Sequence, residues 1–104
     1  MHIDLKGHGV TFTEALGEHA RRRLAFALSR FEPRLTRVRL HLEDVNGPKG
    51  GVDKRCRVVV HLAQGGEVLA EDVSADAYEA IASAVERVAR GLGRTLERLR
   101  EGKG

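Results

Sequence analysis

The stretches RVRLHLE at residues 37–43 and RCRVVVHL at residues 55–62 place an apolar side chain at every second position. Successive side chains of a β-strand point to opposite faces of the sheet, so each stretch predicts a strand with one apolar face and one cationic face. Between them, the turn-forming cluster NGPKGG at 46–51 predicts an exposed connection. The two stretches therefore predict neighbouring strands whose apolar faces share one core.

Two further strands are predicted outside this pair. Ile3 and Leu5 alternate with polar neighbours until the sequence GHG at residues 7–9, which indicates a short, half-buried strand followed by a turn. Glycines at 65–66 can adopt the positive backbone angles of a tight hairpin, and a strand is expected at residues 67–73. The sheet is therefore expected to have four strands.

The first helix is expected from about Glu14 to Arg30. Thr13 can act as its N-cap, and Pro33 disfavours helical geometry in the residue before it. Its apolar stripe consists of Leu16, Ala20, Leu24, Ala27 and Leu28.

The second helix, which Ser74 or Asp76 can cap, is the most periodic segment of the chain. Its apolar positions step by three or four: Tyr78, Ile81, Val85, Val88, Leu92, Leu96 and Leu99. Tyr78 is expected to anchor its start on the sheet. Gly91 and Gly93 each weaken the helix by about 1 kcal/mol relative to alanine, so its C-terminal third is expected to fray unless it packs or binds something.

The element order is β-α-β-β-β-α, which predicts an α+β fold with a four-stranded mixed sheet and two helices on one face. A strand-helix-strand connection is normally right-handed, so the first two strands should be parallel and the others antiparallel. No linker divides the 104 residues, so we expect a single domain at 1–104, with a folded core at 1–100 and a short tail at 101–104.

Composition favours a globular protein over a membrane-spanning or secreted one. Hydrophobic residues make up 41% and charged residues 32%, an ordinary globular mixture. No apolar run approaches the roughly 20 residues needed to span a bilayer, and the N-terminus lacks the features of a secretory signal. The single cysteine, Cys56, cannot form an internal disulfide and is expected to be a buried thiol, which fits a cytoplasmic protein.

Motifs for catalysis or cofactor binding are missing from the sequence. The five histidines show no metal-ligand spacing with one another or with Cys56, and the glycine-rich segments match no phosphate or dinucleotide loop. Glu71, Asp72 and Asp76 are better explained as partners of a helix N-terminus than as ligands of a hard cation. We therefore expect a protein that is not an enzyme and needs no cofactor, metal ion or small-molecule substrate.

Charge is segregated along the chain, although its formal net value is only +3. Seven arginines and one acid lie at residues 21–39, six acids and no Lys or Arg at 64–86, and five arginines and one acid at 87–100. In the second helix, Arg87, Arg90 and Arg94 lie three and four residues apart and form a ridge.

The arginines of the first helix, Arg22, Arg23 and Arg30, fall outside its apolar stripe. If the two helices pack side by side, these arginines and the ridge can form one basic track for a phosphate backbone. A solvated face balanced by Glu86 and Glu97 explains the pattern equally well.

Three motifs carry a resemblance to a known family. They are GHxVxxTEAL at residues 7–16, GGE at 65–67 and DxYxAI at 76–81. With them, nearly the whole chain resembles the ribosome hibernation promoting factor and ribosome-associated inhibitor family, and it looks like a short form without a second domain. Phe26 stands where members of that family often have a basic residue, and Ala77 replaces a usual methionine.

The resemblance implies a fold related in appearance to double-stranded-RNA-binding domains. It also implies binding to the small ribosomal subunit, to its 16S rRNA and neighbouring proteins, in the mRNA and tRNA channel, which blocks initiation in resting or stressed cells. The family's basic positions correspond here to Arg23, with Arg22 beside it, and to the ridge. The protein is expected to be a monomer off the ribosome.

Two other functions remain open from the residues alone, a general RNA-binding module and a protein-interaction domain. The second would use the open sheet face with Arg37, Arg39, Arg55 and Arg57. Because the chain has no tryptophan and few other aromatic residues, RNA recognition is expected to rest mainly on phosphates and on RNA shape.

Overall fold

The computed structural model describes residues 1–45 and 53–102, and the predicted connection at 46–51 lies outside them. The elements in chain order are β1 (His2–His8), α1 (Glu14–Leu28), the 3-10 helix η1 (Ser29–Arg34), β2 (Leu35–Asp44), β3 (Lys54–Leu62), β4 (Glu67–Ser74) and α2 (Ala77–Gly102). The predicted order of strands and helices is confirmed.

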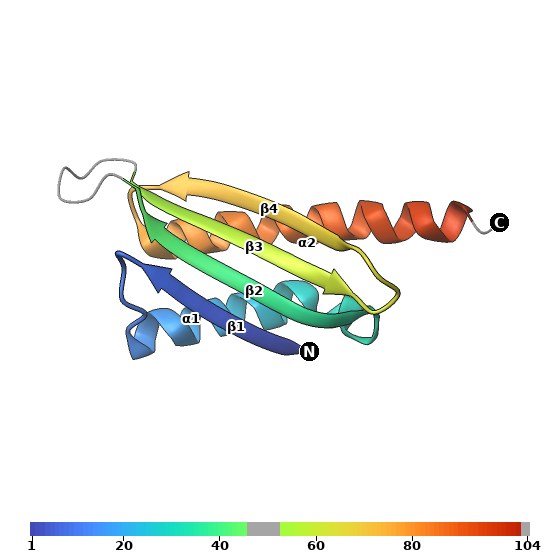
Figure 1. Ribbon diagram of the computed structural model, residues 1–104, viewed down its shortest axis with the longest axis horizontal. Coiled ribbons are helices and arrows are strands. Elements are labelled where there is room, and N and C mark those ends of the chain that lie inside the picture. Colours follow the sequence, from blue (N-terminus) through green and yellow to red (C-terminus); the bar gives the residue numbers. More distant parts are fainter. Residues whose placement is uncertain (46–52, 103–104) are drawn as a thin grey trace.

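The sheet has the strand order β1-β2-β3-β4. β1 pairs with β2 in parallel, with Ile3 opposite Val38, and the other two pairs of strands are antiparallel. Figure 1 shows both helices behind the sheet, on the same face, while the other face of the sheet is open. The α+β fold with a mixed four-stranded sheet and helices on one face is therefore confirmed.

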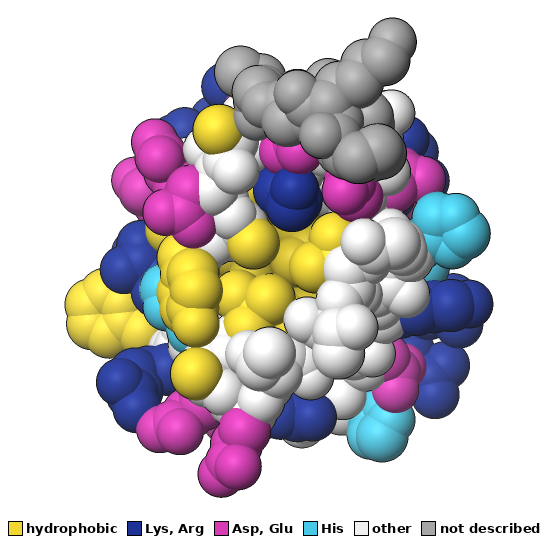
Figure 2. All heavy atoms as spheres, turned by 90° about the vertical axis from the view of Figure 1, so that its left-hand side faces the viewer, with side chains coloured by type: hydrophobic (Ala, Val, Ile, Leu, Met, Phe, Trp, Pro, Cys, Tyr) yellow, Lys and Arg dark blue, Asp and Glu magenta, His cyan; other side chains and the backbone are white. Residues whose placement is uncertain are grey.

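The core lies between the sheet and the helices. On β2 and β3, every second residue from Val38 to Leu42 and from Cys56 to Val60 is fully buried, as the alternation predicts. Leu24 of α1 and Leu92 of α2 are fully buried against them. Figure 2, which looks at the end of the molecule where both helices begin, shows hydrophobic side chains in the middle and charged side chains around the rim.

The first helix ends two residues earlier than expected. α1 stops at Leu28, and Ser29–Arg34 form a 3-10 helix that contains Pro33. Arg30 therefore lies on this tighter turn, beyond the end of α1. At the other end, the Thr13 hydroxyl accepts a hydrogen bond from the Leu16 amide at 3.1 Å, which confirms the predicted N-cap.

The second helix is capped at its start and packed into the core as far as Leu96. Asp76 accepts a hydrogen bond from the Tyr78 amide at 2.8 Å, which is the geometry of an N-cap. The helix continues past both glycines of its C-terminal third, and Leu92 and Leu96 are buried there. Packing therefore supports the helix through both glycines and up to Leu96, while residues 97–100 are exposed.

The buried thiol of Cys56 leads to a first prediction. Its side chain has no exposed surface, and burial raises the pKa of the thiol to about 12. At neutral pH the reactive thiolate is therefore scarce, and reagent cannot reach it. We expect an aromatic disulfide reagent to leave the native protein unmodified at pH 8 and to label one thiol per chain in denaturant. Rapid labelling of the native protein would contradict this.

Candidate nucleic-acid interface

A groove of about 310 Å³ runs between the two helices. Its lining comes from α1, the start of η1 and the middle of α2: Arg23, Phe26, Ala27, Arg30, Ala82, Val85, Glu86, Ala89 and Arg90. Alanine supplies three of these positions. Its short side chain leaves space between two closely packed helices, while longer side chains form the sides of the groove.

The groove brings together three of the six arginines predicted for the site. Arg23 and Arg30 line it from the first helical segment, and Arg90 lines it from α2. All three side chains are exposed. The predicted convergence of the two basic rows therefore holds for these three residues.

The other three arginines lie elsewhere on the helical surface. Arg22 forms an ion pair with Glu18, one turn earlier in α1. The Arg87 Nε lies 3.2 Å from Asp72 Oδ2 of β4, so this arginine leans toward the edge of the sheet, away from the groove. Arg94 is exposed one turn after Arg90. Helical spacing predicted the ridge but not that its residues would reach different neighbours.

The groove arginines are weakly neutralised. Among the described residues, Arg23 and Arg30 have no acidic partner, and the Arg30 guanidinium lies 4.5 Å from the centre of the Phe31 ring. Arg90 reaches only Glu86, with an N–O distance of 3.6 Å. Because exposed pairs of this kind contribute about 0–1 kcal/mol, a phosphate can displace the carboxylate at little cost.

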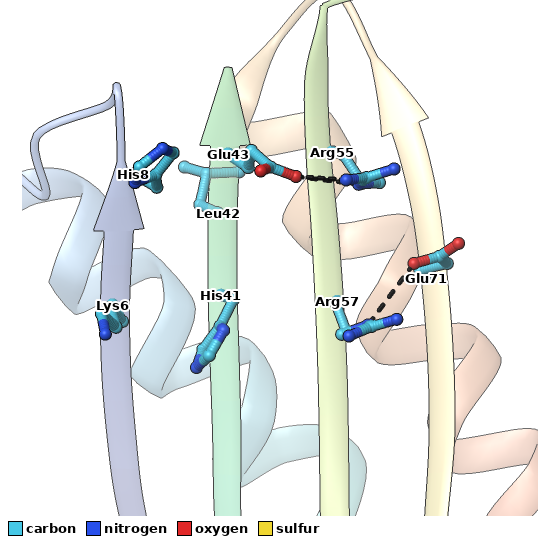
Figure 3. Close-up of a pocket in the computed structure, with 8 residues that line it drawn as sticks. All are labelled: Lys6, His8, His41, Leu42, Glu43, Arg55, Arg57 and Glu71. Carbon is cyan, nitrogen blue, oxygen red and sulfur yellow. Dashed lines mark hydrogen bonds and ion pairs between the residues drawn. The ribbon is translucent and has the colours of Figure 1, made fainter. Parts of the chain in front are cut away.

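The open face of the sheet contrasts with the groove. Its register places Glu43 opposite Arg55 and Glu71 opposite Arg57. Figure 3 shows both resulting ion pairs, which line a shallow pocket of about 420 Å³. In the first pair, the Arg55 Nε donates a hydrogen bond to a Glu43 carboxylate oxygen at 3.0 Å. Arg37 also has a partner, Asp4 of β1, at 3.3 Å. Most of the cationic pattern on this face is therefore balanced across the strands.

Further members of this pocket are Lys6, His8 and His41, which lie on β1 and β2 (Figure 3). None of the three was among the residues expected at the site. Parallel pairing places Lys6 directly opposite His41, a proximity that depends on the register of strands far apart in sequence.

Tyr78 makes a contact that differs from the one expected. Its ring lies edge-on to His19 of α1, with ring centres 4.8 Å apart, and a nitrogen of His19 lies 3.2 Å from the Tyr78 carbonyl oxygen. The tyrosine therefore connects the start of α2 to α1, whereas the sequence analysis placed its anchor on the sheet. This contact joins the two helices that form the groove.

Phe26 lines the groove, although the sequence pointed to it only as a departure from the resembled family and not as a site residue. Its side chain is 86% exposed. The available signal was its position, since Phe26 is a large apolar residue outside the apolar stripe of its helix.

Neither a metal centre nor a membrane segment is found in the described part of the chain. No three His, Cys, Asp or Glu side chains gather there closely enough to hold a metal ion. None of its helices combines the length and apolar character that crossing a membrane would require.

Solved structures with a similar fold are known for other proteins. The crystal structure of the Thermus thermophilus Protein Y N-terminal domain is similar, with a TM-score of 0.75 and 27% identity over 91% of this chain and 99% of that one. A ribosomal subunit interface protein from Coxiella burnetii matches in fold, with a TM-score of 0.78 and 20% identity over 93% and 99% of the two chains. Comparison with curated proteins gives no match.

The family comparison covers nearly all of the sequence. Residues 3–100 match the family described as sigma 54 modulation protein / S30EA ribosomal protein. This range contains every element except the first residue of β1, His2, and the last two residues of α2, Glu101 and Gly102. The chain therefore belongs to the sigma 54 modulation protein / S30EA ribosomal protein family.

Proposed function

We propose that this protein is a cytoplasmic ribosome-associated factor that inhibits translation in resting cells. It binds the 16S rRNA of the small ribosomal subunit in the channel for mRNA and tRNA, and it blocks initiation by occupying that channel. It acts as a monomer by binding alone, without catalysis or a cofactor.

Membership of a ribosomal family supports the class of partner. The structural observation that carries the proposal is the groove with Arg23, Arg30 and Arg90. Guanidinium groups bind phosphate oxygens through paired hydrogen bonds, and converging arginines from two helices match a phosphate backbone better than they match a single small anion.

A competition experiment tests the proposal against a general RNA-binding function. Labelled protein bound to small ribosomal subunits is challenged with unlabelled small subunits or with random-sequence duplex RNA. We expect the subunits to compete at far lower concentration than the duplex, and the bound protein to prevent binding of initiator tRNA and mRNA. Equal competition by small subunits and by duplex RNA would favour a general RNA-binding module.

A nuclease control tests the protein-interaction alternative. Pull-down from a stationary-phase lysate is expected to recover ribosomal components only while the rRNA is intact. A partner that is retained after complete nuclease digestion would contradict the proposal and favour a protein-binding surface, such as the open sheet face.

A further inference from the structure

The aromatic ring of Phe26 is exposed to solvent at the basic groove. Phe26 is 86% exposed, whereas the other large hydrophobic side chains of the described residues that reach the surface are 36–52% exposed. None of the described aromatic or cationic side chains stacks on its ring. The ring therefore has a face available for a partner.

The neighbours of Phe26 are cationic. Arg23 precedes it by three residues in α1, which places both on one side of that helix, and Arg30 lines the same groove from the start of η1. Arg90 contributes to the same groove from the facing helix. A partner that contacts the ring therefore lies within reach of three guanidinium groups.

This combination of groups favours one class of ligand. An apolar side chain of another protein would cover the ring but leave the guanidinium groups without counter-charges. An unpaired nucleotide has both a flat base that stacks on an aromatic ring and phosphates on either side of it.

We propose that Phe26 is a stacking platform for one unpaired base of the bound RNA. Arg23, Arg30 and Arg90 hold the phosphates that flank this base. The proposal rests on the proposed function and adds base stacking to the recognition by phosphates and shape that the sequence predicts. Because every base has a flat face, this contact fixes where the RNA strand lies without reading its sequence.

Three substitutions separate stacking from simple apolar contact. Affinity for purified small ribosomal subunits is measured for Phe26→Ala, Phe26→Leu and Phe26→Trp. Loss of one stacked base weakens binding by about 5- to 150-fold, so we expect that loss for the alanine and leucine variants and near wild-type affinity for the tryptophan variant. The melting temperature should not change, since the side chain is exposed.

Two results would overturn the proposal. If the alanine variant binds as tightly as the wild-type protein, the ring has no role in binding. If leucine replaces phenylalanine without loss, the contact is an apolar one, as expected for a protein partner.

Fluorescence provides a direct readout of stacking. The chain has no tryptophan, so Phe26→Trp introduces a single reporter, and a base stacked on its indole quenches the emission. Leu69→Trp is the matched control, because Leu69 is 52% exposed on the edge strand β4, away from the helical groove. Small subunits should quench the first variant and not the second, and equal quenching of both, or of neither, would contradict the proposal.

The experiment also distinguishes failure of this inference from failure of the proposed function. Wild-type protein that does not bind small subunits contradicts the proposed function itself. Quenching of Phe26→Trp by oligoadenylate, a single-stranded RNA, then decides whether Phe26 stacks on bases. Wild-type binding with an unaffected alanine variant contradicts the stacking inference alone.

Discussion

Replacing Arg23, Arg30 and Arg90 together by alanine is expected to weaken binding to small ribosomal subunits about 1,000-fold. Hydrogen bonds to charged groups contribute about 1.5–3 kcal/mol each. Three lost contacts therefore amount to at least roughly 4.5 kcal/mol, which corresponds to this loss of affinity. The measurement is a titration of labelled protein with purified subunits at fixed salt concentration.

Two controls make this result specific. The three side chains are exposed, so the circular dichroism spectrum and melting temperature of the variant should match the wild-type protein. Arg37, Arg55 and Arg57 form a matched triple on the open sheet, where each has an acidic partner. Their replacement by alanine should leave affinity near the wild-type value, and a larger loss from this triple would place the RNA on the wrong face.

The ridge predicted from helical spacing gives a further comparison. Arg87, Arg90 and Arg94 share only Arg90 with the groove triple. Loss of affinity that is greater for the ridge triple would place the phosphates along the outer surface of α2, beyond the groove.

Affinity is also expected to fall steeply with salt. Binding of phosphates by arginines releases condensed counterions, which contributes about −0.7 to −0.9 per contact to the slope of log affinity against log salt. If all six arginines of the candidate site contact phosphates, the slope should be about −4 to −5. The site predicted from the sequence comprises Arg22, Arg23, Arg30, Arg87, Arg90 and Arg94. Titrations at several salt concentrations measure the slope.

Single alanine substitutions show which arginines contact phosphates. Each alanine replacement of an arginine that touches phosphate should flatten the slope by nearly one unit. Arg22 and Arg87 already pair with carboxylates, so their separate values test whether RNA displaces those partners. The pair Arg55 and Arg57 should leave the slope unchanged. A flatter slope for that pair, with no change for the helix variants, would reverse the assignment of faces.

Sequence patterns were sufficient for the fold because strands and helices bury residues at different periods. Alternation at Val38 to Leu42 and steps of three or four in α2 each identify one buried face, and the structure buries those faces. The end of α1 was less predictable. Pro33 excludes a continued α-helix but does not determine where the tighter 3-10 turn begins.

The candidate site depends on contacts between elements, which a single sequence does not contain. Neutralisation of Arg55 and Arg57 results from strand register, and the pairing of Arg87 with Asp72 results from the position of α2 beside β4. The groove likewise depends on how closely α1 and α2 approach. Sequence reasoning therefore identified the basic residues but not which of them remain available.

The ion pairs across the open sheet have a consequence for how the protein meets a large polyanion. A protein with unneutralised cations on opposite surfaces can connect two RNA molecules and draw them into aggregates. Here Arg55 pairs with Glu43, Arg57 with Glu71 and Arg37 with Asp4, so three of the four arginines predicted on the open sheet face have an acidic partner, while unneutralised arginines remain on the helices. The field of such a molecule is asymmetric and turns it helix-first during diffusion toward RNA. We therefore expect that excess protein does not connect two RNA molecules through its sheet.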